Sequence, residues 1–142
     1  MRKILVFISL LVAFQSCNLK KDNKKKQEPI MYKPSEMALL MRGMYEFNNV
    51  LKMQIINKDS LLPFPEEFVN IHSAVLTDKF ERNDEFDSLS KKYLIYQKAI
   101  YTSRSDSTAY FFNQSIQTCV TCHEPRCTGP IPKIKKLLIP EM

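Results

Sequence analysis

The sequence has few of the residues on which turn-rich β proteins depend. It contains no Trp and only 2 Gly among 142 residues, against 7 Met. Glycine supplies the backbone conformations of tight turns, so this shortage disfavours an all-β fold and favours helices. The length accommodates one domain of ordinary size and leaves little room for a second.

The part of the chain that can fold has no surplus of charge. The formal net charge is +6, but residues 1–26 alone hold seven basic residues and one acidic residue. The other 116 residues contain 14 of each sign. A basic domain is the electrostatic signature of nucleic-acid binding. Because the surplus lies outside the foldable part, we expect no nucleic-acid partner.

Residues 1–16 have the pattern of an export signal. Arg2 and Lys3 form a positive start, and an almost uninterrupted apolar run follows from Ile4 to Phe14. This run is shorter than the roughly 20 apolar residues that a bilayer span needs. The segment is therefore predicted to be a secretory signal.

Ser16 and Cys17 follow this run and resemble the end of a bacterial lipoprotein signal. In such signals a small residue precedes a Cys that is lipidated and becomes the mature N-terminus. Phe14 and Gln15 depart from the usual Leu and small residue. The resemblance implies lipidation of Cys17 and a location on the periplasmic side of a bacterial membrane. The alternative is an ordinary cleaved signal that ends near a Cys.

The next residues, 17–32, are rich in Lys and have almost no periodic apolar content. Such a segment cannot bury enough apolar surface to order itself. We expect it to be a flexible tether that holds a domain off the membrane. The folded domain is then predicted over residues 33–142.

Four segments have the apolar periodicity of amphipathic helices. They are predicted at 35–58, at 65–80, after an N-cap at Asn83, and before a stop at Pro125. Residues 103–106 are predicted to form a turn. Four amphipathic helices with short connections predict an all-α fold, an antiparallel up-down-up-down four-helix bundle.

The second helix and the C-terminal tail are predicted to contribute apolar side chains to this core. The second helix is expected to bury one face, formed by Phe68, Ile71, Val75 and Leu76. The short tail 133–142 offers four apolar residues that can pack back on the bundle: Ile134, Leu137, Leu138 and Ile139.

Cys119, Cys122 and His123 form C-x-x-C-H, the attachment motif of c-type haem. The two thiols add across the vinyl groups of one porphyrin edge, and the adjacent imidazole reaches the iron from the proximal side. Export agrees with this chemistry, because such attachment takes place outside the cytoplasm. The motif therefore predicts one covalent haem c, with His123 as proximal axial ligand.

Three other uses of these cysteines compete with haem attachment. A Cys119–Cys122 disulfide would suit an oxidising compartment and a haemless helical envelope lipoprotein. A thioredoxin-like redox pair expects the motif at a helix start within a βαβ unit, whereas here it lies at a helix end. A zinc site of these two cysteines with Cys127 lacks a well-spaced fourth ligand.

A helical bundle with C-x-x-C-H near its C-terminus resembles the cytochrome c′ and cytochrome b562-like family. The resemblance covers about residues 34–124 in architecture, and only Cys119, Cys122 and His123 match a specific motif. It implies an antiparallel four-helix bundle with haem packed between the helices and the distal position facing the first helix. The sequence departs from the family after the motif, where residues 124–132 break the helix. The tail is then expected to cover one edge of the haem.

The first helix offers three methionines near the expected position of the iron. The spacing ranks Met41 first as distal axial ligand, then Met37, then Met44; any of them can instead fill the core. Family members with Met at this position are six-coordinate electron carriers, whereas members with a non-ligand are five-coordinate and bind gases. Both functions stay open at this level.

Three further residues bear on the site. Arg42 follows Met41 and can pair with a haem propionate or face solvent. His72 is the only other His, and a bis-His iron is a minor alternative to a structural role. Cys127 has no thiol partner left if Cys17 is lipidated and the motif holds haem.

The predicted function is one-electron transfer by a lipid-anchored monohaem cytochrome c. No acid–base pair or nucleophilic constellation in the sequence indicates an enzyme. The expected partners are the membrane, through the lipid anchor, and a redox protein that the sequence does not identify. The oligomeric state stays open, and a homodimer is one option.

Overall fold

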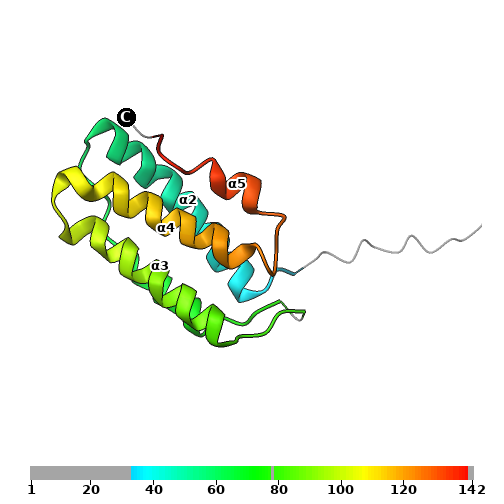
Figure 1. Cartoon of the computed structure of the whole chain (residues 1–142). Coiled ribbons are helices and arrows are strands. Elements are labelled where there is room, and N and C mark those ends of the chain that lie inside the picture. The colour runs from blue at the N-terminus through cyan, green and yellow to red at the C-terminus, as the bar shows by residue number, and fades with distance from the viewer. Residues whose placement is uncertain (1–32, 78, 141–142) are drawn as a thin grey trace, which may run out of the picture. The chain divides into compact units, whose positions relative to one another are not determined.

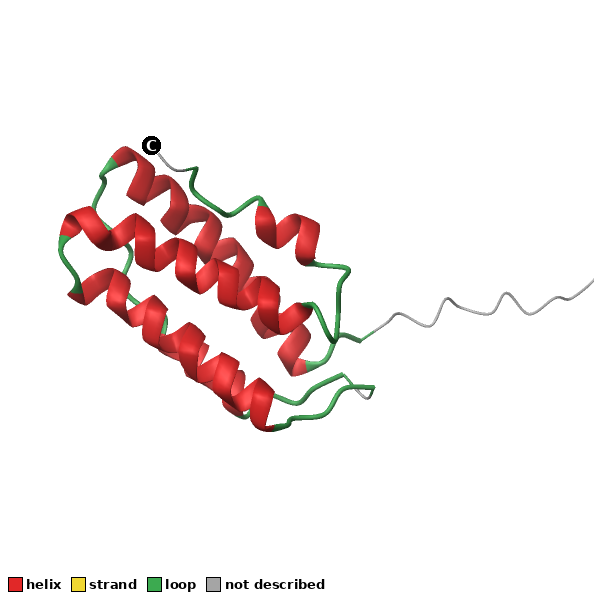
Figure 2. Cartoon of the chain, in the orientation of Figure 1, coloured by secondary structure: helices red, strands yellow, loops and turns green. Residues whose placement is uncertain are grey.

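The computed structural model describes residues 33–77 and 79–140 (Figure 1). Within these ranges the regular structure is entirely helical, which confirms the all-α class (Figure 2). Cys17, the predicted signal 1–16 and the predicted tether 17–32 lie outside the described residues. None of the helices in the described part combines the length and the apolarity that a bilayer crossing requires.

Helix α2 spans Glu36–Asn57 and is fixed by a cap at each end. The Ser35 hydroxyl oxygen accepts a hydrogen bond from the Ala38 N–H at 3.1 Å. At the other end Lys58 adopts the left-handed conformation, with φ of 60°, and its N–H reaches the carbonyl groups of the last turn. The predicted range 35–58 is confirmed.

Helices α3 (Asp84–Thr102) and α4 (Thr108–His123) form a hairpin. The Asn83 side chain caps α3 by accepting from the Phe86 N–H at 2.9 Å, as predicted. The chain then reverses through a short 3-10 turn, η3 (Ser105–Ser107), which overlaps the predicted turn at 103–106. Figure 1 shows α4 running back along α3.

The predicted second α-helix over 65–80 is wrong for most of its length. Only a 3-10 helix, η2 (Glu66–His72), forms there, and irregular chain follows. A 3-10 helix brings side chains three residues apart onto one line, and Phe68 and Ile71 use this spacing to enter the core. Ala74 is buried as well, whereas Val75, expected inside, is 59% exposed.

Contacts with α2 explain why the helix does not continue after His72. The Val75 carbonyl oxygen accepts from the Met37 N–H at 3.0 Å, and the Val75 N–H donates to the Glu36 carboxylate at 2.9 Å. These two backbone groups would otherwise form helical hydrogen bonds. The segment instead satisfies one of the unpaired N–H groups at the start of α2, that of Met37.

The core consists of two apolar clusters. One joins the start of α2 to the start of α3 and the end of α4, and the other joins the second half of α2 to the end of α3 and the first half of α4. In the first, Met37 and Met44 of α2 lie with Phe86 of α3, and Cys119 and Cys122 pack against them. In the second, Leu51 from the second half of α2 packs with residues on the side of the hairpin nearer the α3–α4 turn: Ile100, Phe112 and Ile116. The described residues contain three long helices, α2, α3 and α4, where four were predicted.

The residues after the motif, which we call the C-terminal strap (residues 128–140), pack on α2 and α4. They include the short helix α5 (Ile131–Lys135). Asn113 of α4 binds both backbone groups of Ile139, donating to its carbonyl at 2.8 Å and accepting from its N–H at 2.9 Å. Leu137 and Ile139 are buried, so the prediction that the tail packs back is confirmed.

Candidate haem site

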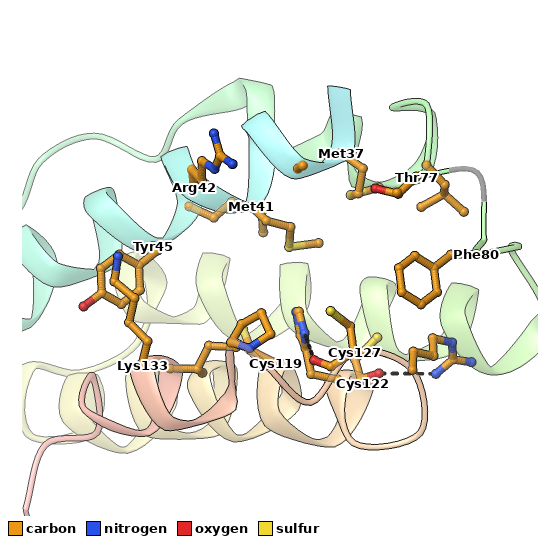
Figure 3. A pocket seen from close by; sticks show the side chains of 18 of the residues that line it. Met37, Met41, Arg42, Tyr45, Thr77, Phe80, Cys119, Cys122, Cys127 and Lys133 are labelled. Carbon is orange, nitrogen blue, oxygen red and sulfur yellow. Dashed lines mark hydrogen bonds between the residues drawn. The ribbon is translucent and has the colours of Figure 1, made fainter. Parts of the chain in front are cut away.

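A cavity of about 560 Å³ lies between the first half of α2 and the end of α4 (Figure 3). One side is closed by Leu76, Thr77, Phe80 and Glu81, and another by the strap, through Pro130, Ile134 and Leu137. Its lining is predominantly apolar, and its volume falls in the range of about 300–1,000 Å³ typical of sites for organic ligands. A large apolar cofactor therefore fits its chemistry.

The three residues of the haem-attachment motif all line this cavity. Cys119 and Cys122 are three residues apart on α4, so their side chains lie on one helix face. His123 is the last residue of α4 and is half-buried. Two thiols and one imidazole thus share one wall.

The imidazole of His123 has a defined hydrogen-bond partner. Its Nδ1 atom lies 3.0 Å from the carbonyl oxygen of Cys127. A carbonyl oxygen can only accept, so Nδ1 is the donor in this contact, and the Nδ1–H tautomer leaves an electron pair free on Nε2. Metal-ligating histidines use this arrangement, in which a hydrogen bond from the second nitrogen sets the tautomer and the ring orientation.

The turn that provides this carbonyl is anchored by Arg126. Its guanidinium donates to the Glu85 carboxylate at 2.7 Å, to the Asn83 side chain at 2.8 Å and to the Cys122 carbonyl at 3.3 Å. Only 17% of the Arg126 side chain is exposed. Arg126 therefore ties the turn after the motif to the start of α3. No local pattern indicates this pairing, because the partners lie about 40 residues apart in the chain.

Both motif thiols are neutral in the folded chain. Burial raises the pKa of Cys119 to about 12. Burial also raises the pKa of Cys122, although the nearby Arg126 opposes this shift. Thioredoxin-like cysteines have lowered pKa values at helix N-termini, whereas these lie at the C-terminal end of α4. The geometry therefore does not support a thioredoxin-like redox pair. Cys119, Cys122 and Cys127 are all free thiols in this structure.

The three candidate methionines all line the cavity, but their environments differ. Met37 and Met44 are 7% and 5% exposed and belong to the first apolar cluster. Met41 is half-buried, and Figure 3 shows its side chain reaching from α2 into the space that separates it from the cysteines. Met41 would therefore lose the fewest apolar contacts of the three if its sulfur bound a metal.

The remaining candidates fall into two groups. Arg42 and Cys127 line the cavity, with Arg42 exposed and Cys127 half-buried. His72 does not line it; this exposed residue has its Nδ1 atom 3.2 Å from the Ser90 hydroxyl. A bis-His arrangement through His72 gains no support.

No group of three or more His, Cys, Asp or Glu side chains within residues 33–77 and 79–140 is arranged to hold a metal ion directly. Haem iron makes a smaller demand on the chain, because the porphyrin supplies four ligands and the protein supplies the axial ones. The donor set present, one imidazole with a thioether sulfur on the facing wall, is of this axial kind.

A buried polar network lies beside the cavity and was not predicted. Asn48, which lines the cavity, donates to the Tyr93 hydroxyl at 3.3 Å and accepts from Gln97 at 2.7 Å. Gln97 also donates to Ser115 at 3.0 Å, and its Oε1 has no hydrogen-bond partner within the described residues. The network joins α2, α3 and α4 immediately next to the site. Asn48 within an otherwise apolar helix stripe was the available signal.

Comparisons with protein-family models, with curated proteins and with solved structures give no match for this chain.

Proposed function

We propose that the protein is a c-type cytochrome that carries one electron through a covalently attached haem. One observation carries the proposal: Cys119, Cys122 and His123 line a single apolar cavity, and His123 keeps Nε2 free by donating from Nδ1 to the Cys127 carbonyl. Haem, when bound, supplies the iron that alternates between the ferric and ferrous states.

The chain's own residues have three tasks in this proposal. Cys119 and Cys122 would hold the cofactor through thioether bonds, each formed by addition of S–H across a vinyl group. The His123 Nε2 atom would bind the iron, in an orientation that the Cys127 carbonyl maintains. The apolar lining keeps water away from the metal and so limits the charge reorganisation of each electron transfer.

Met41 is the proposed distal ligand. It is the half-buried methionine of the three, and its side chain enters the cavity from the facing helix (Figure 3). A thioether ligand raises the reduction potential and occupies the coordination position that a gas would need. Met37 and Met44 remain the alternatives, in that order.

We also propose that the chain follows the plan of an antiparallel four-helix bundle in which one helix has been lost. The segment 58–83 returns from the end of α2 to the start of α3, and η2 packs on both helices. It thus follows the path that a second helix takes in an up-down-up-down bundle. The resemblance to the cytochrome c′ and b562-like family is proposed on this basis.

The cellular setting is part of the same proposal. Lipidation of Cys17 would anchor the protein on the periplasmic side of a bacterial membrane, with residues 17–32 as tether. A redox protein would then exchange electrons with the haem at this surface. The formation of a homodimer is an open part of the proposal.

The deciding experiment is expression of the full chain together with haem-attachment machinery. We expect the denatured protein in alkaline pyridine to show the absorbance of a covalently attached haem. C119A and C122A should each lose one thioether bond, whereas C127A, the matched control in the same cavity, should keep both. A wild-type protein without covalent haem would contradict the proposal and favour the haemless lipoprotein with a Cys119–Cys122 disulfide.

The distal ligand has a separate test in the ferric spectrum. Wild-type protein should be low-spin with a weak methionine-to-iron charge-transfer band at long wavelength, and M41A should lose this band. M37A and M44A serve as controls that retain it. A high-spin wild-type spectrum would exclude Met41 ligation and assign the protein to the five-coordinate, gas-binding class.

A further inference from the structure

The basic residues that line the cavity are few, and they differ in what they already bind. They are Arg42 of α2, Arg126 after α4 and Lys133 of α5. Arg126 already binds the Glu85 carboxylate, the Asn83 side chain and the Cys122 carbonyl. The other two are therefore the cations available to a ligand in this cavity.

Lys133 reaches from the strap across to α2. Its Nζ atom lies 4.0 Å from the centre of the Tyr45 ring. It also lies 3.9 Å from the Glu46 carboxylate, in a loose pair whose side chains are 63% and 71% exposed. An exposed pair at this distance contributes little free energy, so Lys133 can exchange Glu46 for a better carboxylate at low cost.

Arg42 lies on the same part of α2, three and four residues before Tyr45 and Glu46. Within the described residues its guanidinium forms no ion pair and no hydrogen bond. The cavity thus has one cation from α2 without an ion pair among the described residues and one from the strap that is only loosely paired. Figure 3 shows Lys133 beside Tyr45 at one end of the cavity and Phe80 at the other.

The chemistry of the proposed cofactor demands such a site. The thioether bonds fix the vinyl edge of the porphyrin at Cys119 and Cys122, and the two propionate carboxylates extend from the opposite edge. A carboxylate at the margin of an apolar cavity needs a cation or water, because burying it alone is costly. Charge-assisted hydrogen bonds from Lys or Arg meet that need.

We infer that Lys133 and Arg42 together form the binding site for the haem propionates, so that the strap holds the cofactor by a charged contact as well as by its apolar wall. The inference rests on the proposed function and deepens it. The other charged or titratable residues that line the cavity are Tyr45, Glu46, Glu81, Cys119, Cys122, His123, Arg126 and Cys127. Glu46 competes for Lys133, and the binding of a propionate releases it to solvent.

Lys135 provides a matched control for Lys133. Both lysines belong to α5, both are exposed, and only Lys133 lines the cavity. K133Q and K135Q therefore remove the same charge from the same short helix. A difference between the two variants reports contact with the cofactor, since their effects on the overall charge are equal.

The test is low-frequency resonance Raman spectroscopy of the haem-loaded full chain. The propionate bending bands shift when a propionate loses a cationic partner. We expect a shift in K133Q and in R42Q, and wild-type frequencies in K135Q. Unchanged bands in either K133Q or R42Q, or an equal shift in K135Q, would overturn the paired site.

The same samples separate this inference from the proposed function. Absence of covalent haem from the denatured wild-type protein in pyridine would contradict the proposed function itself. Presence of covalent haem, with bands that K133Q leaves unchanged, would contradict only the propionate site. The substituted side chains are exposed, so all three variants should fold and bind haem.

Discussion

The His123 Nδ1 atom lies 3.0 Å from the Cys127 carbonyl oxygen, so the break in the helix directly after the motif supplies the group that orients the imidazole. In a continuous helix the carbonyl of residue 127 would point further along the axis, away from the ring. Pro125 prevents that continuation, because proline has no N–H and its ring clashes with the preceding turn. The interruption of the helix after the motif therefore contributes to the arrangement that orients His123.

Arg126→Gln should destabilise the turn that carries this carbonyl. The substitution removes charge-assisted hydrogen bonds of a largely buried guanidinium, and we expect the free energy of unfolding to fall by about 1.5–3 kcal/mol in urea titrations. Arg104→Gln is the control, since the Arg104–Asp106 pair is 88% and 64% exposed. Its effect should be close to zero. Equal losses in the two variants would contradict an anchoring role for Arg126.

Cys119 should resist alkylation in the folded, haem-free, reduced protein. Its pKa is raised from an ordinary value of 9.0 to about 12, so the thiolate fraction near pH 8 falls by roughly three orders of magnitude. Mass spectrometry of iodoacetamide-labelled peptides should show this difference between the native chain and the same chain in denaturant. Native labelling within tenfold of the denatured rate would contradict it.

The same pKa makes the haem-free fold sensitive to alkali. The unfolded chain loses the Cys119 proton near pH 9, whereas the folded chain keeps it until about pH 12. The contribution of this thiol is therefore complete below about pH 9 and is lost as the pH rises toward 12. C119A should flatten this part of the stability profile, measured by thermal unfolding at each pH. An unchanged profile in C119A would assign the alkaline loss to other groups.

Met44→Ala should cost more stability than Met41→Ala in the haem-free protein. Met44 is 5% exposed within the first apolar cluster, and its truncation should cost about 2–5 kcal/mol. Met41 is half-buried at an existing cavity, so its truncation should cost about 1 kcal/mol. Urea unfolding of both variants tests the order. A reversed order would mean that Met41 is a packing residue.

Asn113→Ala should release the strap. The side chain satisfies both the N–H and the carbonyl of Ile139, and its loss leaves these groups unpaired at a cost of about 1–3 kcal/mol. We expect faster cleavage by trypsin after Lys135 and Lys136 than in the wild type. Gln117→Ala, at an exposed position of the same helix, should leave the cleavage rate unchanged. Equal rates for the two variants would contradict the role of Asn113.

The long helices could be predicted from the sequence because their ends have local signals. Ser35 and Asn83 cap α2 and α3 through their own side chains, within three residues of the groups they bind. The apolar stripe of α2 likewise identified Met37, Met44 and Leu51 as buried. Such features depend on neighbours in the sequence, and periodicity reveals them.

The second helix could not be predicted because distant contacts decide its structure. The backbone of Val75 forms hydrogen bonds with Met37 and Glu36, about 40 residues earlier, and no local sequence pattern indicates these contacts. The Arg126–Glu85 pair was missed for the same reason. In the site, the C-x-x-C-H motif could be recognised from the sequence. The Cys127 carbonyl that orients His123 could not, because its position depends on how the backbone turns after the motif.

The placement of the strap also has a consequence for the order of assembly. The cavity wall formed by Pro130, Ile134 and Leu137 follows Cys119, Cys122 and His123 in the chain. If the chain is exported N-terminus first and carries haem as proposed, the motif emerges before the wall that encloses it. Haem attachment to a cleft that the strap has not yet covered, followed by packing of the strap, would then be the order of assembly.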